Sequence, residues 1–190
     1  LLPVFEKALA LHSQAEGDRK PCAQALLGFL VERLRVYLRE RDVRHDVVSA
    51  VFARGSDDIV DIVGKARYLA DFLHTPDGSN LIAAYRRADG ILKQQKMIAK
   101  AVSTDMFEQD AEGALFAALF DLPDTLDTSL QAYRQYLDEL AALRISVDGF
   151  FDAVLVNAED DKLRMNRLAI LVRLVASMDL VGDLAVIEKG

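Results

Sequence analysis

The chain has 190 residues, 52% of them hydrophobic, and its formal net charge is −7. This apolar content is enough for the core of one domain and argues against intrinsic disorder, while a single cysteine, Cys22, excludes a disulfide within the chain and fits a reducing cytosol. No apolar run reaches the roughly 18 residues that predict a membrane span, so we expect a cytoplasmic protein with no membrane partner.

The first predicted element is a short apolar helix over 1–11, and the absence of an initial Met suggests a piece of a longer protein. A polar break follows and ends at Pro21, which suits the first turn of another helix. We therefore expect 1–21 to be the end of a preceding region with its linker, and 22–190 to form one helical domain.

Apolar residues recur at helical spacing through the rest of the chain, and no alternating strand pattern occurs. Thr75 and Pro76 predict the start of one helix, while Ser146 and Asn157 are expected to cap the last two. The predicted helices cover 22–41, 46–53, 58–73, 76–96, 107–120, 125–143, 147–156 and 157–180. The sequence thus predicts an all-α bundle of about eight helices with short connections.

No pattern of catalytic or metal-binding residues stands out. A glycine-rich phosphate loop is absent, and no Ser/His/Asp or Cys/His arrangement occurs. The three histidines are far apart and lack partner cysteines, which gives a zinc site little support. We therefore predict no catalytic residue and no metal site in this chain.

Three groups of basic residues are candidate RNA-binding surfaces, although the net negative charge weighs against nucleic-acid binding as a whole. The first, between 33 and 44, is interleaved with acidic residues and is typical of a solvated, salt-bridged face. The second lies on the helix after Pro76 and comprises Arg86, Arg87, Lys93, Lys96 and Lys100. Tyr85 beside it is either a core residue or a platform for an unpaired base.

The third group lies on the last predicted helix and comprises Lys162, Arg164, Arg167 and Arg173, with Asn166 among them. Phe150, Phe151 and Asn157 come just before it. Aromatic rings, amides and arginines close together are what recognition of unpaired RNA requires. Spacing alone leaves an alternative open, in which Asn157 caps a helix and Asn166 and Arg167 bridge helices.

Residues 147–160 read VDGFFDAVLVNAED, and 161–171 continue as DKLRMNRLAIL. This stretch resembles a hallmark region of the bacterial glycyl-tRNA synthetase β subunit family, and also the DALR-type anticodon-binding domain shared with arginyl-tRNA synthetases. Stretches 34–48, 71–81 and 84–92 agree in the same order, so the resemblance covers 25–190. Asp89-Gly90 depart from the asparagine-containing pair usual in the family, and 160–164 are not a literal DALR.

The resemblance implies a tRNA-binding module without a catalytic centre or cofactor of its own. It would belong to a glycine–tRNA ligase of two α and two β subunits, in which the α subunit uses ATP and Mg and the β subunit grips glycine tRNA. A helical scaffold without RNA contact and the DALR domain of an arginyl enzyme remain alternatives. The expected RNA-binding residues are Tyr85, Arg86, Arg87, Lys93, Asn157, Arg164, Asn166 and Arg167.

Overall fold

The computed structural model describes residues 1–11, 19–55, 58–95 and 101–188. Within them the chain forms nine α-helices and two short 3-10 helices, and no strand, which confirms the predicted all-α fold. The elements are α1 (Leu2–Leu11), α2 (Arg19–Arg39), α3 (His45–Phe52), α4 (Ile59–Leu73), α5 (Pro76–Lys93), η1 (Thr104–Met106), α6 (Asp110–Phe120), α7 (Leu130–Ala142), α8 (Arg144–Ala153), α9 (Asp161–Met178) and η2 (Leu184–Val186). Lys96 and Lys100 lie outside the described residues.

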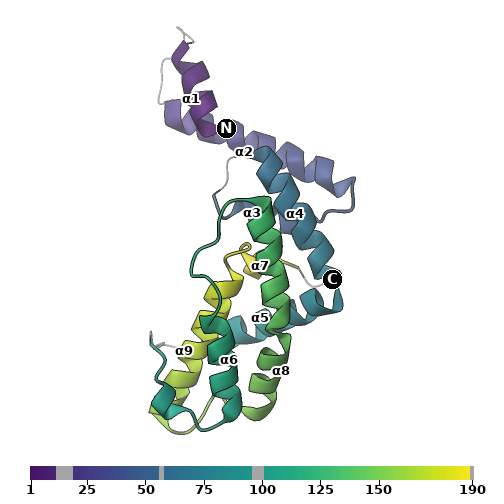
Figure 1. Cartoon of the computed structure of the whole chain (residues 1–190). Coiled ribbons are helices and arrows are strands. Elements are labelled where there is room, and N and C mark those ends of the chain that lie inside the picture. The colour runs from purple at the N-terminus through teal and green to yellow at the C-terminus, as the bar shows by residue number, and fades with distance from the viewer. Residues whose placement is uncertain (12–18, 56–57, 96–100, 189–190) are drawn as a thin grey trace.

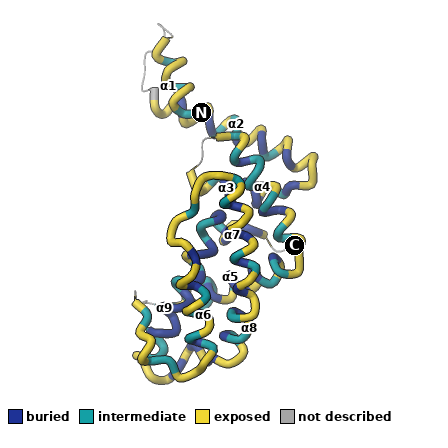
Figure 2. The backbone as a smooth tube through the Cα atoms, in the orientation of Figure 1, coloured by how far each residue is buried: buried dark blue, intermediate teal, exposed yellow. Residues whose placement is uncertain are grey.

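The helices form an elongated bundle (Figure 1). Helices α2, α3 and α4 lie toward one end, α6, α8 and the start of α9 lie at the other, and α5 crosses between them. Helix α5 packs against α9, α6 against α8, and α4 against α3 and α7. Helix α1 packs against α2 and contributes no buried residue, so it lies outside the main core (Figure 2).

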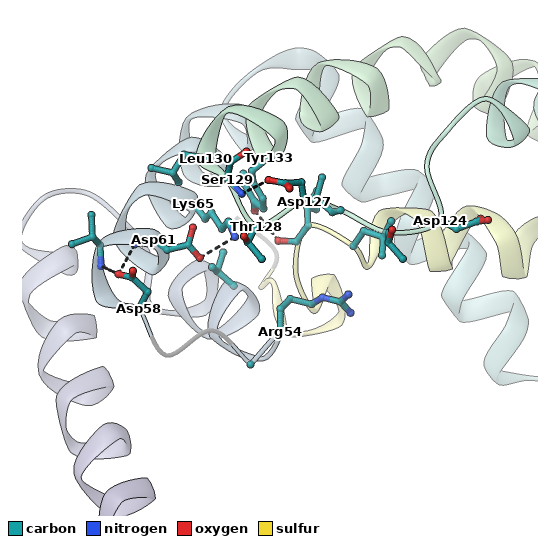
Figure 3. Close-up of a pocket in the computed structure, with 17 residues that line it drawn as sticks. Arg54, Asp58, Asp61, Lys65, Asp124, Asp127, Thr128, Ser129, Leu130 and Tyr133 are labelled. Carbon is teal, nitrogen blue, oxygen red and sulfur yellow. Dashed lines mark hydrogen bonds and ion pairs between the residues drawn. The ribbon is translucent and has the colours of Figure 1, made fainter. Parts of the chain in front are cut away.

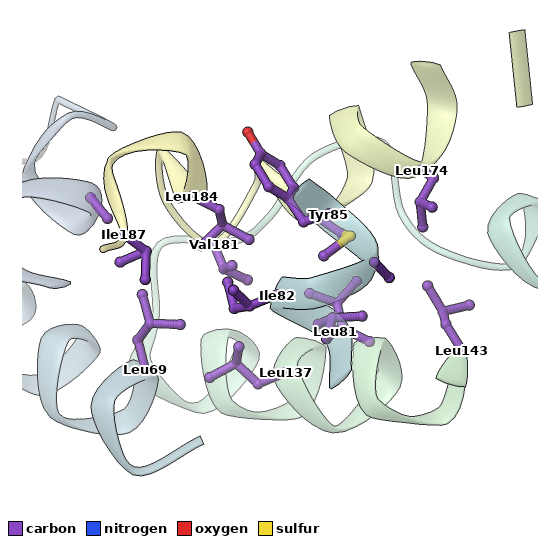
Figure 4. Packing of buried hydrophobic residues seen from close by; sticks show 14 of the residues in the cluster. Leu69, Leu81, Ile82, Tyr85, Leu137, Leu143, Leu174, Val181, Leu184 and Ile187 are labelled. Atoms are coloured by element: carbon purple, nitrogen blue, oxygen red, sulfur yellow. The ribbon is translucent and has the colours of Figure 1, made fainter. Parts of the chain in front are cut away.

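One continuous hydrophobic core joins the two ends of the bundle (Figure 4). Helix α5 contributes one face to this core, and the segment after α9 adds three buried apolar residues. These core residues are Leu81, Ile82, Tyr85 and Ala88 from α5, and Val181, Leu184 and Ile187 from the C-terminal segment. Burial of each large apolar side chain contributes about 1.5–3 kcal/mol, so the C-terminal segment is an integral part of the fold.

Helix α5 begins as predicted. The Thr75 hydroxyl accepts a hydrogen bond of 3.0 Å from the backbone N–H of Gly78, and Pro76 occupies the first turn. The domain boundary predicted after residue 21 falls within α2, which runs on through Pro21. Proline is tolerated there because the N–H groups of a first helical turn have no partner within the helix. The division into two regions stays a prediction.

Two predicted helix caps are wrong. Helix α8 begins at Arg144 without a side-chain cap, so Ser146 lies inside it. Asp160 rather than Asn157 caps α9, because its carboxylate accepts hydrogen bonds from the N–H groups of Lys162 at 2.7 Å and Leu163 at 3.0 Å. A charged cap also interacts favourably with the positive end of the helix dipole. Asn157 is therefore left in the loop between α8 and α9.

No helix in the described ranges is both long enough and apolar enough to cross a membrane.

Candidate nucleic-acid interface

An acidic cavity of about 820 Å³ lies beside α4 and the loop before α7 (Figure 3). Its lining includes the carboxylates Asp58, Asp61, Asp124 and Asp127, whereas its basic residues are Arg54 and Lys65. Lys65 is already paired with Asp61 at 2.9 Å. Because carboxylates repel phosphate, this cavity does not suit an RNA backbone. Among the described residues no acidic, histidine or cysteine group is arranged to hold a metal ion.

Tyr85 is a core residue. Its side chain is buried beside core residues of the C-terminal segment (Figure 4), and its hydroxyl donates a hydrogen bond of 2.9 Å to Asp179 at the end of α9. Burial and the neighbouring Asp179 carboxylate both raise the pKa of the Tyr85 hydroxyl. With no exposed ring face, Tyr85 offers no platform for an unpaired base.

Asn166 lies on the inner face of α9 and holds a loop in place. Its side-chain oxygen accepts a hydrogen bond of 2.7 Å from the backbone N–H of Ser103, and its amide nitrogen donates one of 3.0 Å to the Ser103 carbonyl. Both polar atoms of this buried amide are therefore satisfied within the chain. Asn166 pins the segment before η1 against α9.

Arg167 is also buried and has three partners. Its Nε donates to Glu112 at 2.9 Å, one terminal nitrogen donates to Glu108 at 3.0 Å, and the other to the carbonyl of Leu155 at 3.0 Å. Burial alone would raise the pKa of Glu112, but the hydrogen bond from Arg167 and those from two backbone N–H groups outweigh it and lower that pKa. Arg167 thus joins α9, the start of α6 and the loop before α9.

Arg86 donates hydrogen bonds to the C-terminal segment. One terminal nitrogen of its guanidinium donates to the carbonyls of Ile187 at 3.1 Å and Glu188 at 2.9 Å. Arg44 donates to the same Glu188 carbonyl at 2.9 Å, and the Glu188 N–H donates to Asp46 at 2.7 Å. These contacts line a smaller cleft of about 420 Å³. The Arg86 guanidinium is therefore occupied by the C-terminal segment.

Arg87, the next residue on α5, faces solvent instead. The central carbon of its guanidinium lies 4.2 Å from the ring centre of Phe151 on α8. Phe150 is fully buried and Phe151 is only partly buried, so the paired phenylalanines divide between the core and the surface. An arginine stacked on a ring holds its planar donor fork in a fixed direction.

Of the three remaining predicted residues, two are exposed and one is partly buried. Asn157 is exposed in the loop after α8, and Lys93 is exposed on α5 and paired with Asp89 at 2.7 Å. Arg164, at the start of α9, donates to the carbonyl of Ala158 at 2.9 Å and pairs with Asp161. We give the name α8–α9 surface to the group of residues around the connection between α8 and α9. It comprises Arg87, Phe151, Leu155, Asn157 and Arg164.

Leu155 is not among the RNA-binding residues predicted from the sequence, although its side chain is one of the most exposed large apolar side chains. Val154 and Val156 on either side are buried. Alternate residues of an extended segment point to opposite sides, so this buried–exposed–buried order follows from the extended backbone at the end of α8. The signal was present in the sequence, but the stretch was predicted as helix.

Comparison with known proteins places the α8–α9 surface within a recognised family range. Residues 81–185 match the model of the DALR anticodon binding domain. The chain is 40% identical to the glycine–tRNA ligase beta subunit of Cereibacter sphaeroides, over 90% of the present chain. It is 38% identical to that of Dinoroseobacter shibae, over 98% of the present chain. The beta subunit of Rhodospirillum centenum is 39% identical over 99% of the chain. The chain spans 26%, 29% and 27% of these three relatives.

Proposed function

Because this chain belongs to the DALR anticodon binding domain family, we propose that it is a tRNA-binding module that contacts the anticodon arm of glycine tRNA. The match over 81–185 carries the proposal, since that range includes most of α5, all of α6 to α9 and every residue of the α8–α9 surface. The chain has the family's helical framework and, around the connection between α8 and α9, exposed groups suited to RNA.

The proposal extends to the larger assembly. Relatives named as glycine–tRNA ligase beta subunits are similar over 90–99% of the chain, which supports a place in such a subunit. An α subunit would then supply the site for glycine, ATP and Mg, and the two kinds of subunit would work together as a heterotetramer in the cytoplasm. The present chain would contribute binding of the tRNA rather than chemistry.

The α8–α9 surface suits recognition of an unpaired loop. Arg87 is oriented by Phe151, so its fork can bind a phosphate or the edge of a guanine without first losing much rotamer entropy. The exposed side chains of Leu155 and Asn157 offer an apolar contact and an amide for a base edge. Arg164 adds a further guanidinium to this surface, and Lys93 is an exposed cation farther along α5. We retain Arg87, Lys93, Asn157 and Arg164 as the proposed RNA contacts.

The buried residues predicted to bind RNA take another role in this proposal. Arg167 holds the carbonyl of Leu155, and Arg164 holds the carbonyl of Ala158, on either side of Asn157. These two hydrogen bonds fix the backbone of the loop that presents Leu155 and Asn157. Asn166 and Arg167 are therefore positioning residues, while Tyr85 and Arg86 stabilise the core and the C-terminal segment.

A salt titration of binding tests the proposal, with glycine tRNA and a non-cognate tRNA compared. We expect a preference for glycine tRNA, and we expect Arg87→Ala to weaken binding about tenfold and to lower the log–log salt slope by about 0.7–0.9. Arg134→Ala is the matched control, because Arg134 is also exposed and stacked over a ring, that of Tyr68, 5.7 Å away.

The control should change neither the affinity nor the salt slope. Equal binding to both tRNAs, unaffected by Arg87→Ala, would leave only unspecific electrostatic attraction. No binding even at low salt would favour the alternative of a helical scaffold that packs subunits without contacting RNA.

A further inference from the structure

The outer face of α2, together with the turn that follows it, carries two aromatic–arginine pairs of the same construction. The guanidinium carbon of Arg33 lies 5.1 Å from the ring centre of Phe29, and that of Arg41 lies 3.7 Å from the ring centre of Tyr37. Each pair is spaced four residues apart, as neighbours on one helical face are. We call these four residues the α2 ladder. Its two units are separated by about 12 Å along the helix.

The α2 ladder faces away from the bundle. Leu27, Val31, Leu34 and Leu38 on the opposite side of the helix are buried, whereas Phe29 is 53% and Tyr37 46% exposed. Figure 2 shows the exposed side of α2 at the end of the molecule remote from α6 and α8. Two large aromatic rings half exposed on one helix are a surface feature that the core does not explain.

Within the described residues neither Arg33 nor Arg41 is in an ion pair, whereas Arg35, which lies between them, pairs with Glu32. The polar contact of Arg41 besides its ring is a donated hydrogen bond of 3.2 Å to the Tyr37 carbonyl. In a chain of net charge −7, two unpaired guanidinium groups side by side with rings select an anionic partner.

We propose that the α2 ladder is a second RNA-binding surface, on which unpaired bases stack against Phe29 and Tyr37 while Arg33 and Arg41 bind the adjoining phosphates. Stacking on aromatic rings combined with arginine contacts to the backbone is how proteins hold single-stranded nucleic acid. The inference rests on the proposed function, because the RNA is the same tRNA. It extends the tRNA contact from the α8–α9 surface to α2, which lies outside the matched range 81–185.

The absence of tryptophan from the sequence provides a direct test. Tyr37→Trp introduces a single fluorophore into the ladder, and a stacked base quenches indole fluorescence. Phe120→Trp is the matched control, because Phe120 is 69% exposed on α6 and has Arg173 at 5.9 Å from its ring centre. We expect glycine tRNA to quench the tryptophan fluorescence of the Tyr37→Trp protein, and the midpoint of this quenching should coincide with the midpoint of the tRNA-binding curve. The fluorescence of the Phe120→Trp protein should be unchanged.

Affinity measurements give a second, independent readout. We expect Tyr37→Ala and Arg41→Ala each to weaken tRNA binding at least about fivefold, while Tyr37→Phe, which keeps the ring, retains full affinity. The thermal midpoint of unfolding should be unaltered by these substitutions because the side chains are exposed. That control separates loss of RNA contact from loss of the fold.

The outcomes distinguish this inference from the proposed function. If the chain binds glycine tRNA but the Tyr37→Trp signal is constant and both alanine variants bind normally, the α2 ladder makes no RNA contact and the proposed function stands. If Tyr37→Trp responds to another protein segment rather than to tRNA, the ladder is a protein interface and the inference is wrong. If no tRNA binds at all, the proposed function fails and this inference with it.

Discussion

Arg167 on α9 and Glu112 on α6 form a buried ion pair, with 2.9 Å between Nε and Oε1. Their exposed fractions are 5% and 1%. The second carboxylate oxygen of Glu112 accepts the backbone N–H groups of Glu108 and Gln109, each at 2.9 Å. The Glu112 carboxylate therefore both accepts hydrogen bonds from the free N–H groups at the start of α6 and neutralises the charge of Arg167. The loop that presents Leu155 is tied to this pair through Arg167.

Removal of one member of this pair should be costly. We expect Arg167→Ala to lower the free energy of unfolding by about 3–5 kcal/mol, because it leaves the Glu112 carboxylate buried without its partner. Urea unfolding measures the change. Combining Arg167→Met with Glu112→Gln should cost less than the sum of the two single changes, since no isolated charge is left.

Arg144→Ala is the control for that experiment, because Arg144 pairs with Asp77 at the surface and its loss should alter the urea midpoint little. An Arg167→Ala protein as stable as Arg144→Ala would show that the buried pair contributes nothing to the fold.

The stability of the chain should fall in acid. Hydrogen bonds and a neighbouring arginine outweigh the effect of burial and lower the pKa of Glu112 from its ordinary 4.5 and that of Asp46 from 3.8. A lowered pKa in the folded state adds stability above the unfolded pKa, and this is lost as the pH falls through the folded pKa. We therefore expect the free energy of unfolding to decrease once the pH drops below about 4.5.

Unfolding of Glu112→Gln across the same pH series isolates the contribution of that carboxylate. Its stability should be lower than that of the unaltered chain at neutral pH, and the difference should shrink in acid. A difference that stays constant with pH would mean that Glu112 has the same pKa in both states. The comparison is needed because the pKa of Asp179 is raised, mainly by burial, and its contribution has the opposite sign.

The helices could be predicted from the sequence because helical geometry is local. Apolar residues at intervals of three and four define an inward face, and the buried side chains of α4, Ile62, Ala66 and Leu69, lie where that spacing places them. Helix ends were harder, since Asn157 and Asp160 are both good caps. Which of them caps α9 depends on where the extended segment after α8 ends.

The candidate site could be predicted only in part, because partners remote in sequence decide whether a polar residue is buried. Arg167 lies on the inward face of α9, but Glu112, which makes its burial tolerable, is 55 residues away. Adjacent arginines show the same limit: Arg86 reaches the C-terminal carbonyls, whereas Arg87 stacks on Phe151. Composition favoured both equally as RNA contacts.

Gly78 on α5 should be intolerant of any side chain. A Cβ atom there would lie 2.0 Å from the carbonyl oxygen of Phe72 and 2.9 Å from the Cα of Leu73, and backbone atoms at the end of α4 cannot rotate aside. We expect Gly78→Ala to lower the free energy of unfolding by about 1–3 kcal/mol, measured by thermal or urea unfolding.

Gly90 on the same helix provides the matched control. A Cβ atom at Gly90 meets nothing within 4 Å, so Gly90→Ala should raise stability by about 0.5–1 kcal/mol, as alanine does within a helix. Equal effects of the two substitutions would mean that the backbone between α4 and α5 can shift to make room for a Cβ atom. The close approach of Gly78 to Phe72 would then not exclude a side chain.

The two neighbouring arginines of α5, Arg86 and Arg87, should have separate roles. Arg86→Ala removes the donor to the Ile187 and Glu188 carbonyls and should make local opening of the C-terminal segment easier by about 1.5–3 kcal/mol. The Glu188 amide, which donates to Asp46, should then exchange its hydrogen about tenfold faster or more, as NMR can measure. Arg87→Ala should leave this exchange unchanged.

The same two proteins should behave in the reverse way toward tRNA. Arg86→Ala should keep most of its affinity, because its guanidinium is occupied within the chain, whereas Arg87→Ala should lose affinity without loosening the C-terminal segment. If Arg86→Ala lost tRNA affinity while the Glu188 amide stayed protected from hydrogen exchange, Arg86 would contact RNA directly. Its hydrogen bonds to the carbonyls of the C-terminal segment would then have to break when the complex forms. Exchange and affinity measured on one pair of variants thus assign each arginine to the fold or to the ligand.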